Sequence, residues 1–475
     1  MLRQYSVIIP LLALLLLAAV RPAFSQTGNV KSAREVIMML DKGQYAEVIS
    51  RFDSTMTKAA PEGRLRTIWT SLIDQTGKLR QELGDTAFRY GGYDIVIVTC
   101  KFEKSELDVK VVFDKNSKVA GLFFAPHVET SKESGSGGAS PSDSLKSVPY
   151  VSKDVSFENE KARVTLAGTL TLPDSPGPFP AVVLIAGSGP NDRNETVAGH
   201  KLFLALADYL TRHGIAVLRY DKRGVGKSTG SYASATTTDF ASDALTALNY
   251  LTTLRQIDHK EIGLVGHSEG GIIAPIVADE SPDVAFVVLM GGPGVPGFKI
   301  ILSQLALIDR AVGLSDSTVN AALVVEKKLL HVIMTEKDSA KAAVRLRRIL
   351  ETEVKQTTGE ADASISQLLS PWYTSFLAYD PVPALRKVKC PVLALWGSKD
   401  LQVPPAENMP ALEKALKSGG NKDFKVVDIP GLNHLFQDAK TGSPLEYGSI
   451  KESISPRALE VVTKWILKET RSKGR

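Results

Sequence analysis

One stretch of the chain places a serine between the glycines that a reactive serine requires. Gly266-His267-Ser268-Glu269-Gly270 fits the pattern G-x-S-x-G, and it stands between an apolar run, 262–265, and the helix-like sequence IIAPIVADE. A strand, a sharp turn centred on serine and a helix are the context of a nucleophile elbow. Glycine on both sides leaves room for the strained backbone that exposes the hydroxyl. We therefore predict that Ser268 is a nucleophile.

Two other glycine motifs are interpreted as loops. Gly226-Lys227-Ser228-Thr229-Gly230 also fits G-x-S-x-G, but it adjoins no strand and leads into a polar stretch. Residues 292–297, GPGVPG, fit the G-x-G-x-x-G of dinucleotide sites, but their two prolines lack the N–H groups that bind phosphate. Metal-ligand spacing of His, Cys or carboxylates does not occur. The sequence therefore predicts neither a cofactor nor a metal.

A nucleophilic serine needs a base that takes its proton and an acid that orients the base. Asp400 directly follows the strand-like run PVLALWG, and His434 follows the last strand-like run of the chain. Both lie in loops at the carboxyl ends of strands, and the order Ser, Asp, His is the one found in this kind of sheet. The other histidines fall in a linker, in or beside expected helices, or next to the serine, so His434 is the predicted base. Asp400 is the predicted acid, and its alternatives are Asp380, Asp428 and Asp438.

Attack by serine on a carbonyl creates an oxyanion, which two backbone N–H groups must stabilise. One donor is expected from Glu269, the residue after the nucleophile. The other is expected from the loop after the apolar run AVVLIA, where Ser188 is the candidate and Gly189 the alternative. We expect the polar stretch 189–194 to hold this loop by hydrogen bonds.

The elements that must position these residues alternate between strand and helix from residue 151 onward. Strands are expected at 164–172 (an edge or hairpin strand), 181–186, 215–220, 262–265, 284–290, 392–396 and 424–429, with helices at 202–212 and 240–254. Apolar runs without alternation indicate strands buried on both faces, so we predict a doubly wound, mostly parallel α/β sheet.

Between about residues 297 and 385 helical periodicity replaces the strand pattern. This predicts a helical cap inserted over the site. The aromatic cluster Trp372, Tyr373, Phe376 and Tyr379 ends this segment. Most of these rings are expected in the core, with one or two lining an acyl pocket.

The N-terminal third of the chain carries none of the predicted site residues. Residues 1–25 resemble a cleaved signal peptide, with Arg3, an apolar stretch too short for a comfortable membrane span, and Ala23-Phe24-Ser25 before Gln26. An uncleaved signal anchor is the alternative. Residues 26–126 are predicted to form a small α+β domain, with helices at 32–52 and 65–83 and strands at 93–102, 107–113 and 119–124. Residues 127–150 form a Gly/Ser-rich linker, and 151–475 form the catalytic domain.

Composition excludes some classes of function. The net charge of +5 over 475 residues is too dilute to indicate nucleic-acid binding. No segment beyond the leader could span a bilayer, so the mature protein is expected to be periplasmic or secreted. Cys100 and Cys390 lie in different predicted domains and are expected to be free thiols.

Three motifs together resemble the α/β-hydrolase superfamily. They are Asp221-Lys222-Arg223-Gly224-Val225-Gly226-Lys227-Ser228, Gly266-His267-Ser268-Glu269-Gly270-Gly271 and Gly397-Ser398-Lys399-Asp400. Within it, residues 151–470 resemble exported bacterial carboxylesterases and their serine-aminopeptidase-like relatives. The resemblance implies Ser268 as nucleophile, Asp400 as acid, His434 as base and a cap after the sixth strand. One departure is Ala186-Gly187, where many members have His-Gly. The first domain resembles small modules of unknown role found ahead of such hydrolases.

The sequence thus predicts an exported serine hydrolase that cleaves small carboxylic esters through an acyl-enzyme, without a cofactor. A peptidase or amidase with the same three residues is the nearest alternative. An inactive hydrolase fold that serves as a binding module is a second alternative. The natural substrate, the acyl-chain length and the oligomeric state do not follow from the sequence.

Overall fold

The computed structural model describes residues 27–53, 56–57, 60–90, 93–114, 116–126 and 148–471. The predicted leader, 1–25, lies outside the described residues, as do residues 127–147 of the predicted linker. Contacts divide the chain near residue 140 into two compact units, which are described separately.

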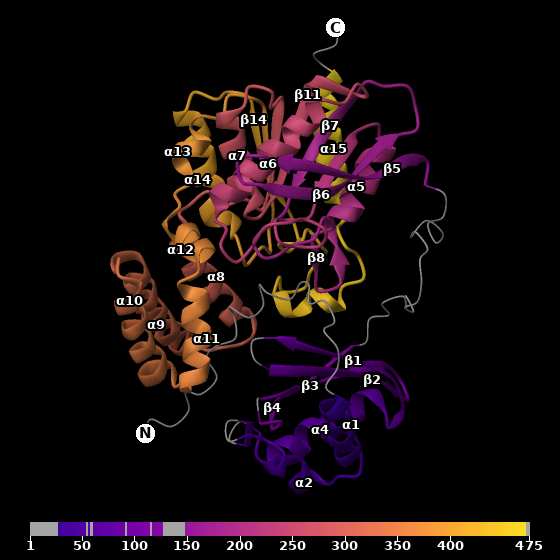
Figure 1. Ribbon diagram of the computed structural model, residues 1–475, viewed down its shortest axis with the longest axis vertical. Coiled ribbons are helices and arrows are strands. Elements are labelled where there is room, and N and C mark those ends of the chain that lie inside the picture. The colour runs from indigo at the N-terminus through magenta and orange to yellow at the C-terminus, as the bar shows by residue number, and fades with distance from the viewer. Residues whose placement is uncertain are drawn as a thin grey trace. The chain divides into compact units, whose positions relative to one another are not determined.

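The N-terminal unit is α+β, as predicted. Helices come first in the described residues, followed by an antiparallel sheet in the order β1-β2-β3-β4 (Figure 1). These elements are α1 (Thr27–Asp41), α2 (Tyr45–Ser50), α4 (Glu62–Thr76), β1 (Leu79–Tyr90), β2 (Tyr93–Phe102), β3 (Glu106–Phe113) and β4 (Val119–Pro126). Alternate residues of β3 are buried, because only one face of this sheet packs against the helices.

Two boundaries in this unit differ from the sequence prediction. The helix expected at 65–83 ends at Thr76, and Leu79 begins a strand that the sequence analysis missed. Gly77 ends the helix with a φ of +77°, which side-chain-bearing residues rarely adopt. The helix expected at 32–52 is likewise broken at Gly43, whose φ is +71°.

The second unit is built on an eight-stranded sheet in the order β14-β13-β12-β11-β7-β10-β6-β5. Its strands are β5 (Tyr150–Asn159), β6 (Val164–Pro173), β7 (Phe179–Ile185), β10 (Ala216–Tyr220), β11 (Ile257–His267), β12 (Phe286–Met290), β13 (Val392–Gly397) and β14 (Phe424–Ile429). In the order β10-β7-β11-β12-β13-β14, all neighbouring strands pair in parallel. Strand β6 pairs antiparallel with both of its neighbours, β10 and β5. The predicted doubly wound, mostly parallel sheet is confirmed. The edge strand is β5, and β6 lies inside the sheet.

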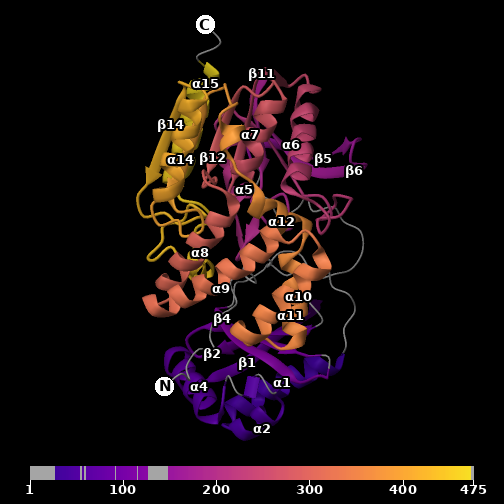
Figure 2. The ribbon, with the colours of Figure 1, turned by 90° about the vertical axis from the view of Figure 1, so that its left-hand side faces the viewer.

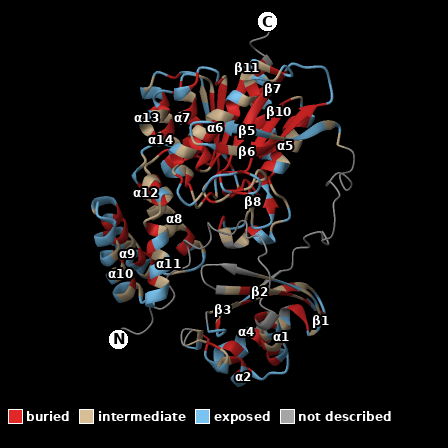
Figure 3. Cartoon of the chain, in the orientation of Figure 1, coloured by how far each residue is buried: buried red, intermediate tan, exposed pale blue. Residues whose placement is uncertain are grey.

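Helices cover both faces of this sheet and give it two apolar cores. One face packs against α6 (Thr237–Thr252), α7 (Gly270–Glu280), α13 (Val382–Leu385) and α14 (Pro405–Ser418). The other packs against α5 (Leu202–Arg212) and α15 (Pro456–Arg471). Strands β7, β10, β11, β12 and β13 are buried along their apolar runs (Figure 3). Burial on both faces explains why their sequences do not alternate.

A set of helices inserted between β12 and β13 forms the cap. It comprises α8 (Gly297–Ala311), α9 (Asp316–Thr335), α10 (Ser339–Ile349) with the π-helical η2 (Leu350–Val354), α11 (Thr358–Leu368) and α12 (Pro371–Ala378). Figures 1 and 2 show these helices gathered at one end of the sheet. They share an apolar core of their own, to which Tyr373 and Leu377 of α12 contribute.

Two further findings concern the described residues as a whole. Cys100 and Cys390 form no disulfide. Among the described residues, the longest helices are too polar or too short to cross a membrane.

Candidate active site

Ser268 lies in the turn between β11 and α7, with a φ of +53°. This left-handed conformation is costly for a residue with a side chain, and it persists because the neighbours enforce it. A Cβ on Gly266 would lie 2.0 Å from the Gly270 carbonyl oxygen, and one on Gly270 would lie 2.0 Å from that of Ile185. Close backbone approach is therefore the reason for both glycines of the motif.

Asp400 and His434, from the loops after β13 and β14, meet in a buried hydrogen bond. His434 Nδ1 donates to Asp400 Oδ2 at 2.7 Å. The N–H groups of Gln402 and Val403 donate to Asp400 Oδ1 at 2.9 and 2.8 Å, which fixes the carboxylate. A base oriented in this way presents its other nitrogen, Nε2, for proton transfer. Within the described chain, no residue hydrogen-bonds to that Nε2.

Gly291 provides the space in which this pair sits. A Cβ at Gly291 would lie 3.2 Å from Asp400 Oδ2 and 3.3 Å from two atoms of the His434 ring. Gly291 also has a φ of +60°. Its predecessor, Met290, accepts a hydrogen bond from Ser268 N at 2.9 Å, so the serine turn and the Asp–His pair adjoin the end of β12. The described residues show no hydrogen bond between the Ser268 hydroxyl and His434, and such bonds often form only when substrate is bound.

The loop after β7 is held by side chains that bind the N–H groups of Gly187 and Gly189. Gly187 N donates to Glu195 Oε1 at 2.6 Å, and Gly189 N donates to Tyr232 Oη at 3.1 Å. Asn191 Nδ2 donates to the carbonyl oxygen of Gly187 at 2.8 Å. This is the kind of anchoring expected of the polar stretch 189–194. Ser188 lines the pocket beside Ser268, and its N–H donates to no described residue, so it is available for an oxyanion.

A buried ion pair links this loop to the histidine loop. Glu195 Oε1 is 2.9 Å from His267 Nδ1, and His267 Nε2 is 3.0 Å from the carbonyl oxygen of His434. Both ring nitrogens of His267 therefore face acceptors, and only the protonated ring satisfies both. Burial by itself lowers the pKa of His267, but the charge and hydrogen bond of Glu195 outweigh it, so this pKa lies above its ordinary value.

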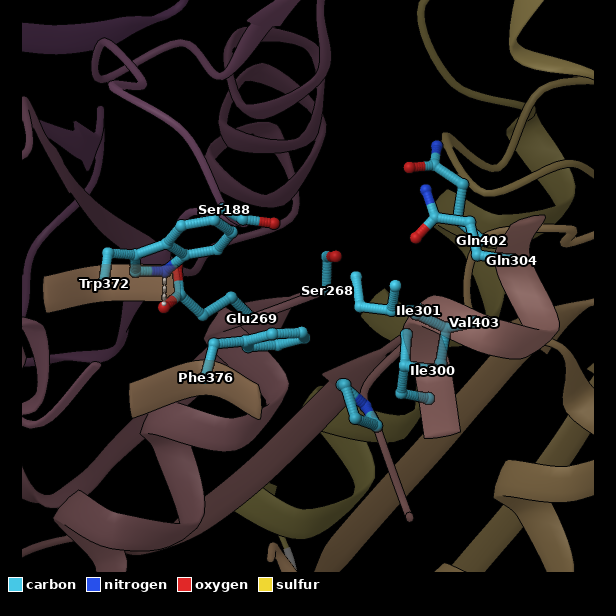
Figure 4. Close-up of a pocket in the computed structure, with 11 residues that line it drawn as sticks. Ser188, Ser268, Glu269, Ile300, Ile301, Gln304, Trp372, Phe376, Gln402 and Val403 are labelled. Atoms are coloured by element: carbon cyan, nitrogen blue, oxygen red, sulfur yellow. Dashed lines mark hydrogen bonds between the residues drawn. The ribbon is translucent and has the colours of Figure 1, made fainter. Parts of the chain in front are cut away.

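Glu269 is held on three sides. Its carboxylate accepts from Lys222 Nζ at 3.0 Å, Thr237 Oγ1 at 2.8 Å and Trp372 Nε1 at 2.7 Å (Figure 4). Lys222 Nζ also donates to the Gly187 carbonyl oxygen at 2.5 Å. Because Trp372 belongs to α12, this contact ties the cap to the residue that follows Ser268. The N–H of Glu269 donates to no residue in the described parts of the chain.

A small pocket opens above Ser268 between the sheet and the cap. Its volume is about 20 Å³, which is room for one water molecule. Figure 4 shows Ser268 between two walls. One wall holds Ser188, Glu269, Trp372 and Phe376, and the other holds Ile300, Ile301, Gln304, Gln402 and Val403. Trp372 and Phe376 thus line the pocket, whereas Tyr373 packs in the cap core, which fits the division expected for the aromatic cluster.

The structure brings together Ser268, Asp400, His434, Ser188 and Glu269, the five residues singled out from the sequence. These residues meet at the carboxyl ends of the strands, next to the neighbouring strands β7 and β11. The helix after β7, α5, packs on one face of the sheet, and the helix after β11, α7, packs on the other. Such a switch point is where open α/β sheets bind ligands. Among the described residues, the alternatives Asp380, Asp428 and Asp438 form no hydrogen bond or ion pair with His434. No group of His, Cys, Asp and Glu suited to a metal ion occurs among the described residues.

Sequence reasoning missed the residues that support this site. They are Glu195, Lys222, Tyr232, His267, Gln304 and Gln402. One signal was available, because Lys222 belongs to the charged run Asp221-Lys222-Arg223 at the end of a buried strand. In that run, Asp221 pairs with Arg193 at 2.8 Å and Arg223 pairs with Asp243 at 2.7 Å. These pairs fix the loop from which Lys222 reaches the site.

The sheet, the cap and the serine turn define the protein as an α/β-hydrolase. Residues 200–438, half of the chain, match the family described as serine aminopeptidase, S33, and the chain belongs to that family. Residues 33–122 match a family described as a protein of unknown function (DUF3887). The protein is thus an esterase-like member of the α/β-hydrolase superfamily with an N-terminal DUF3887 domain.

Two curated relatives of this chain are named as esterases. Esterase EstD of Thermotoga maritima is 27% identical over 406 residues, which cover 85% of this chain and 87% of that protein. Esterase FrsA of Vibrio vulnificus is 28% identical over 152 residues, 32% of this chain and 34% of that protein. These likenesses and the family support a hydrolase of esterase type.

Solved structures also align with this chain. Esterase Pf2001 of Pyrococcus furiosus has 17% identity and a TM-score of 0.41, over 70% of this chain and 96% of that one. Est1E of Butyrivibrio proteoclasticus with ferulic acid has 19% identity and a TM-score of 0.39, over 67% and 98%.

Proposed function

We propose that the protein is an exported serine hydrolase that cleaves carboxylic esters. Ser268 is the nucleophile, His434 the general base and acid, and Asp400 the residue that orients His434. The observation that carries this proposal is the buried Asp400–His434 hydrogen bond of 2.7 Å beside a serine held at a φ of +53°. No cofactor is required by this chemistry.

The proposed reaction has two halves. His434 Nε2 takes the proton of Ser268 as Oγ attacks the ester carbonyl carbon, and the carbonyl oxygen becomes an oxyanion. The N–H groups of Ser188 and Glu269, which no described residue engages, stabilise that oxyanion. Collapse breaks the bond to the alcohol, which receives the proton from His434. Water then repeats the sequence on the acyl-enzyme and releases the acid.

The electrostatics of the pocket favour an ester over a peptide with a free amino terminus. An aminopeptidase needs an acidic group to pair with the substrate ammonium. Glu269 is the one acid among the described residues that line the pocket, and its carboxylate already accepts from Lys222, Thr237 and Trp372. A substrate ammonium would have to compete with the buried Lys222 for that charge.

Two serines in G-x-S-x-G sequences supply a matched experiment. Ser268→Ala is expected to lower hydrolysis of p-nitrophenyl butyrate by 10³-fold or more. Ser228→Ala is expected to retain activity, because Ser228 Oγ is bonded to the backbone of Ala167 and Asp221. Equal activity of the two variants would refute the proposal. Faster turnover of aminoacyl p-nitroanilides than of esters would favour the peptidase alternative, and no turnover of either would favour a binding module.

Export is a separate part of the proposal and rests on the sequence of residues 1–25. It is tested by recovering the full-length gene product from periplasmic and cytoplasmic fractions and sequencing its N-terminus. Export predicts a mature N-terminus at Gln26 in the periplasmic or secreted fraction. An intact leader on cytoplasmic protein would contradict it.

A further inference from the structure

The pocket above Ser268 has one wall that carries two carboxamides. Gln304 comes from α8 of the cap, and Gln402 comes from the loop after β13 of the sheet. Figure 4 shows both side chains across Ser268 from Trp372 and Phe376. The rest of this wall is apolar, namely Ile300, Ile301 and Val403. An apolar pocket with a few convergent polar groups is the usual form of a site that selects its ligand by hydrogen bonds.

The hydrogen-bonding capacity of this pair is only partly used. Gln402 Nε2 donates to Tyr447 Oη at 2.9 Å, which orients the amide and leaves its Oε1 as an acceptor. No hydrogen bond joins the Gln304 carboxamide to any described residue. Together the two side chains offer three N–H donors and two carbonyl acceptors to a bound molecule. A hydroxyl group, which both donates and accepts, matches this set.

The position of Gln402 indicates which part of an ester lies against this wall. Its backbone N–H binds Asp400 Oδ1 at 2.9 Å, so this residue belongs to the acid–base side of the site. Trp372, on the opposite wall, binds the side chain of Glu269, whose N–H is the proposed oxyanion donor. The leaving alcohol must lie on the side from which His434 delivers its proton. The two carboxamides therefore flank the alcohol part of the substrate.

We propose that Gln304 and Gln402 form a subsite for esters whose alcohol carries further hydroxyl groups, that is, for acylated carbohydrates or polyols. This inference rests on the proposed esterase function and deepens it. Because Gln304 belongs to the cap and Gln402 to the sheet, a hydroxyl held between them also joins the two parts around the substrate. Binding energy from the alcohol then contributes to closing the site over Ser268.

The test compares two acetate esters of the same shape. Methyl 6-O-acetyl-glucoside carries ring hydroxyls, and cyclohexylmethyl acetate lacks them. Wild-type protein is expected to cleave the sugar ester with a kcat/KM at least about tenfold higher, since each hydrogen bond to the hydroxyls is worth several-fold. Gln304→Leu and Gln402→Leu are each expected to lower the sugar ester's kcat/KM about three- to tenfold. For cyclohexylmethyl acetate each change should lower kcat/KM less than it does for the sugar ester, so the ratio between the two esters falls toward one.

Gln256→Leu, at an exposed position outside the pocket, is the matched control and should leave the ratio unchanged. A wild-type ratio near one, or a ratio that both leucine variants retain, would overturn the inference. In either case, continued Ser268-dependent cleavage of cyclohexylmethyl acetate would leave the proposed esterase function standing. Absence of cleavage of both esters by wild-type protein would count against both proposals.

Discussion

Glu195→Gln tests the buried pair that joins the two loops of the site. Glu195 Oε1 accepts from Gly187 N at 2.6 Å and from His267 Nδ1 at 2.9 Å, and the side chains of Glu195 and His267 are only 2% and 3% exposed. Glutamine keeps the shape and removes the charge. Hydrogen bonds to a charged group contribute about 1.5–3 kcal/mol and neutral ones about 0.5–1.5 kcal/mol, so two weakened bonds cost roughly 2–3 kcal/mol of unfolding free energy. Glu195 Oε2 has no hydrogen-bond partner among the described residues, and an amide there would also be unpaired.

This loss should depend on pH in a defined direction. The pKa of His267 is raised in the folded protein above the value of about 6.5 expected for an unfolded chain. Its pairing with Glu195 therefore stabilises the fold fully below about pH 6.5, and the stabilisation is lost as pH rises through the folded-state pKa. The difference between wild type and variant should be largest near pH 5.5 and smaller at pH 8.5. Without the charge of Glu195, the His267 ring loses a proton, and its Nε2 no longer donates to the His434 carbonyl oxygen. The histidine loop is then held less firmly, and we expect kcat/KM to fall about tenfold.

Denaturant unfolding at pH 5.5, 7 and 8.5, followed by tryptophan fluorescence, measures this effect. Of the four tryptophans only Trp69 lies outside the hydrolase unit, so the signal reports mainly on that unit. Glu413→Gln, which weakens an exposed pair with Lys417, is the control and should change stability by less than about 0.5 kcal/mol. If Glu195→Gln matched wild type in stability at all three pH values and in kcat/KM, the coupling between the loops would be refuted.

Three further predictions concern the walls of the site. Gly291→Ala should lower kcat more than tenfold, because the new methyl would press on Asp400 and His434 at a backbone φ of +60°; normal activity would contradict the packing described. Trp372→Phe removes the indole donor to Glu269 and should lower kcat/KM about three- to tenfold in steady-state assays, with the cap still folded by circular dichroism. A series of p-nitrophenyl esters should show acetyl or butyryl preferred over acyl chains of eight or more carbons by at least about tenfold, because the pocket of about 20 Å³ must widen by displacement of the cap and each added methylene needs a larger displacement; the reverse order would contradict this account.

The fold and the position of the site could be predicted because both follow from local patterns. Apolar runs bounded by glycine gave the central strands, and loops at their carboxyl ends must share one edge of a parallel sheet. The edge strand β5 was missed because much of it is exposed, including four consecutive residues, so its sequence lacks the apolar run of a buried strand. Strand β1 was missed because its leucines continue the spacing of the preceding helix, and only Gly77 marks the break.

The supporting contacts could not be predicted because they join residues far apart in sequence. Glu195 lies 72 residues from His267, and Trp372 lies 103 residues from Glu269. No local pattern carries such pairings. His267 was excluded as a base because it adjoins the nucleophile, and its second role, holding the His434 backbone, becomes visible only when the loops are placed together.

The most direct test of the central claim is to identify the residue that reacts with a fluorophosphonate. The purified protein is treated with the probe, digested, and analysed by mass spectrometry, alongside the Ser268→Ala and Ser228→Ala variants. The account predicts one adduct, on Ser268, that is lost only in Ser268→Ala together with ester hydrolysis. An adduct on another serine, or ester hydrolysis that survives in Ser268→Ala, would contradict it.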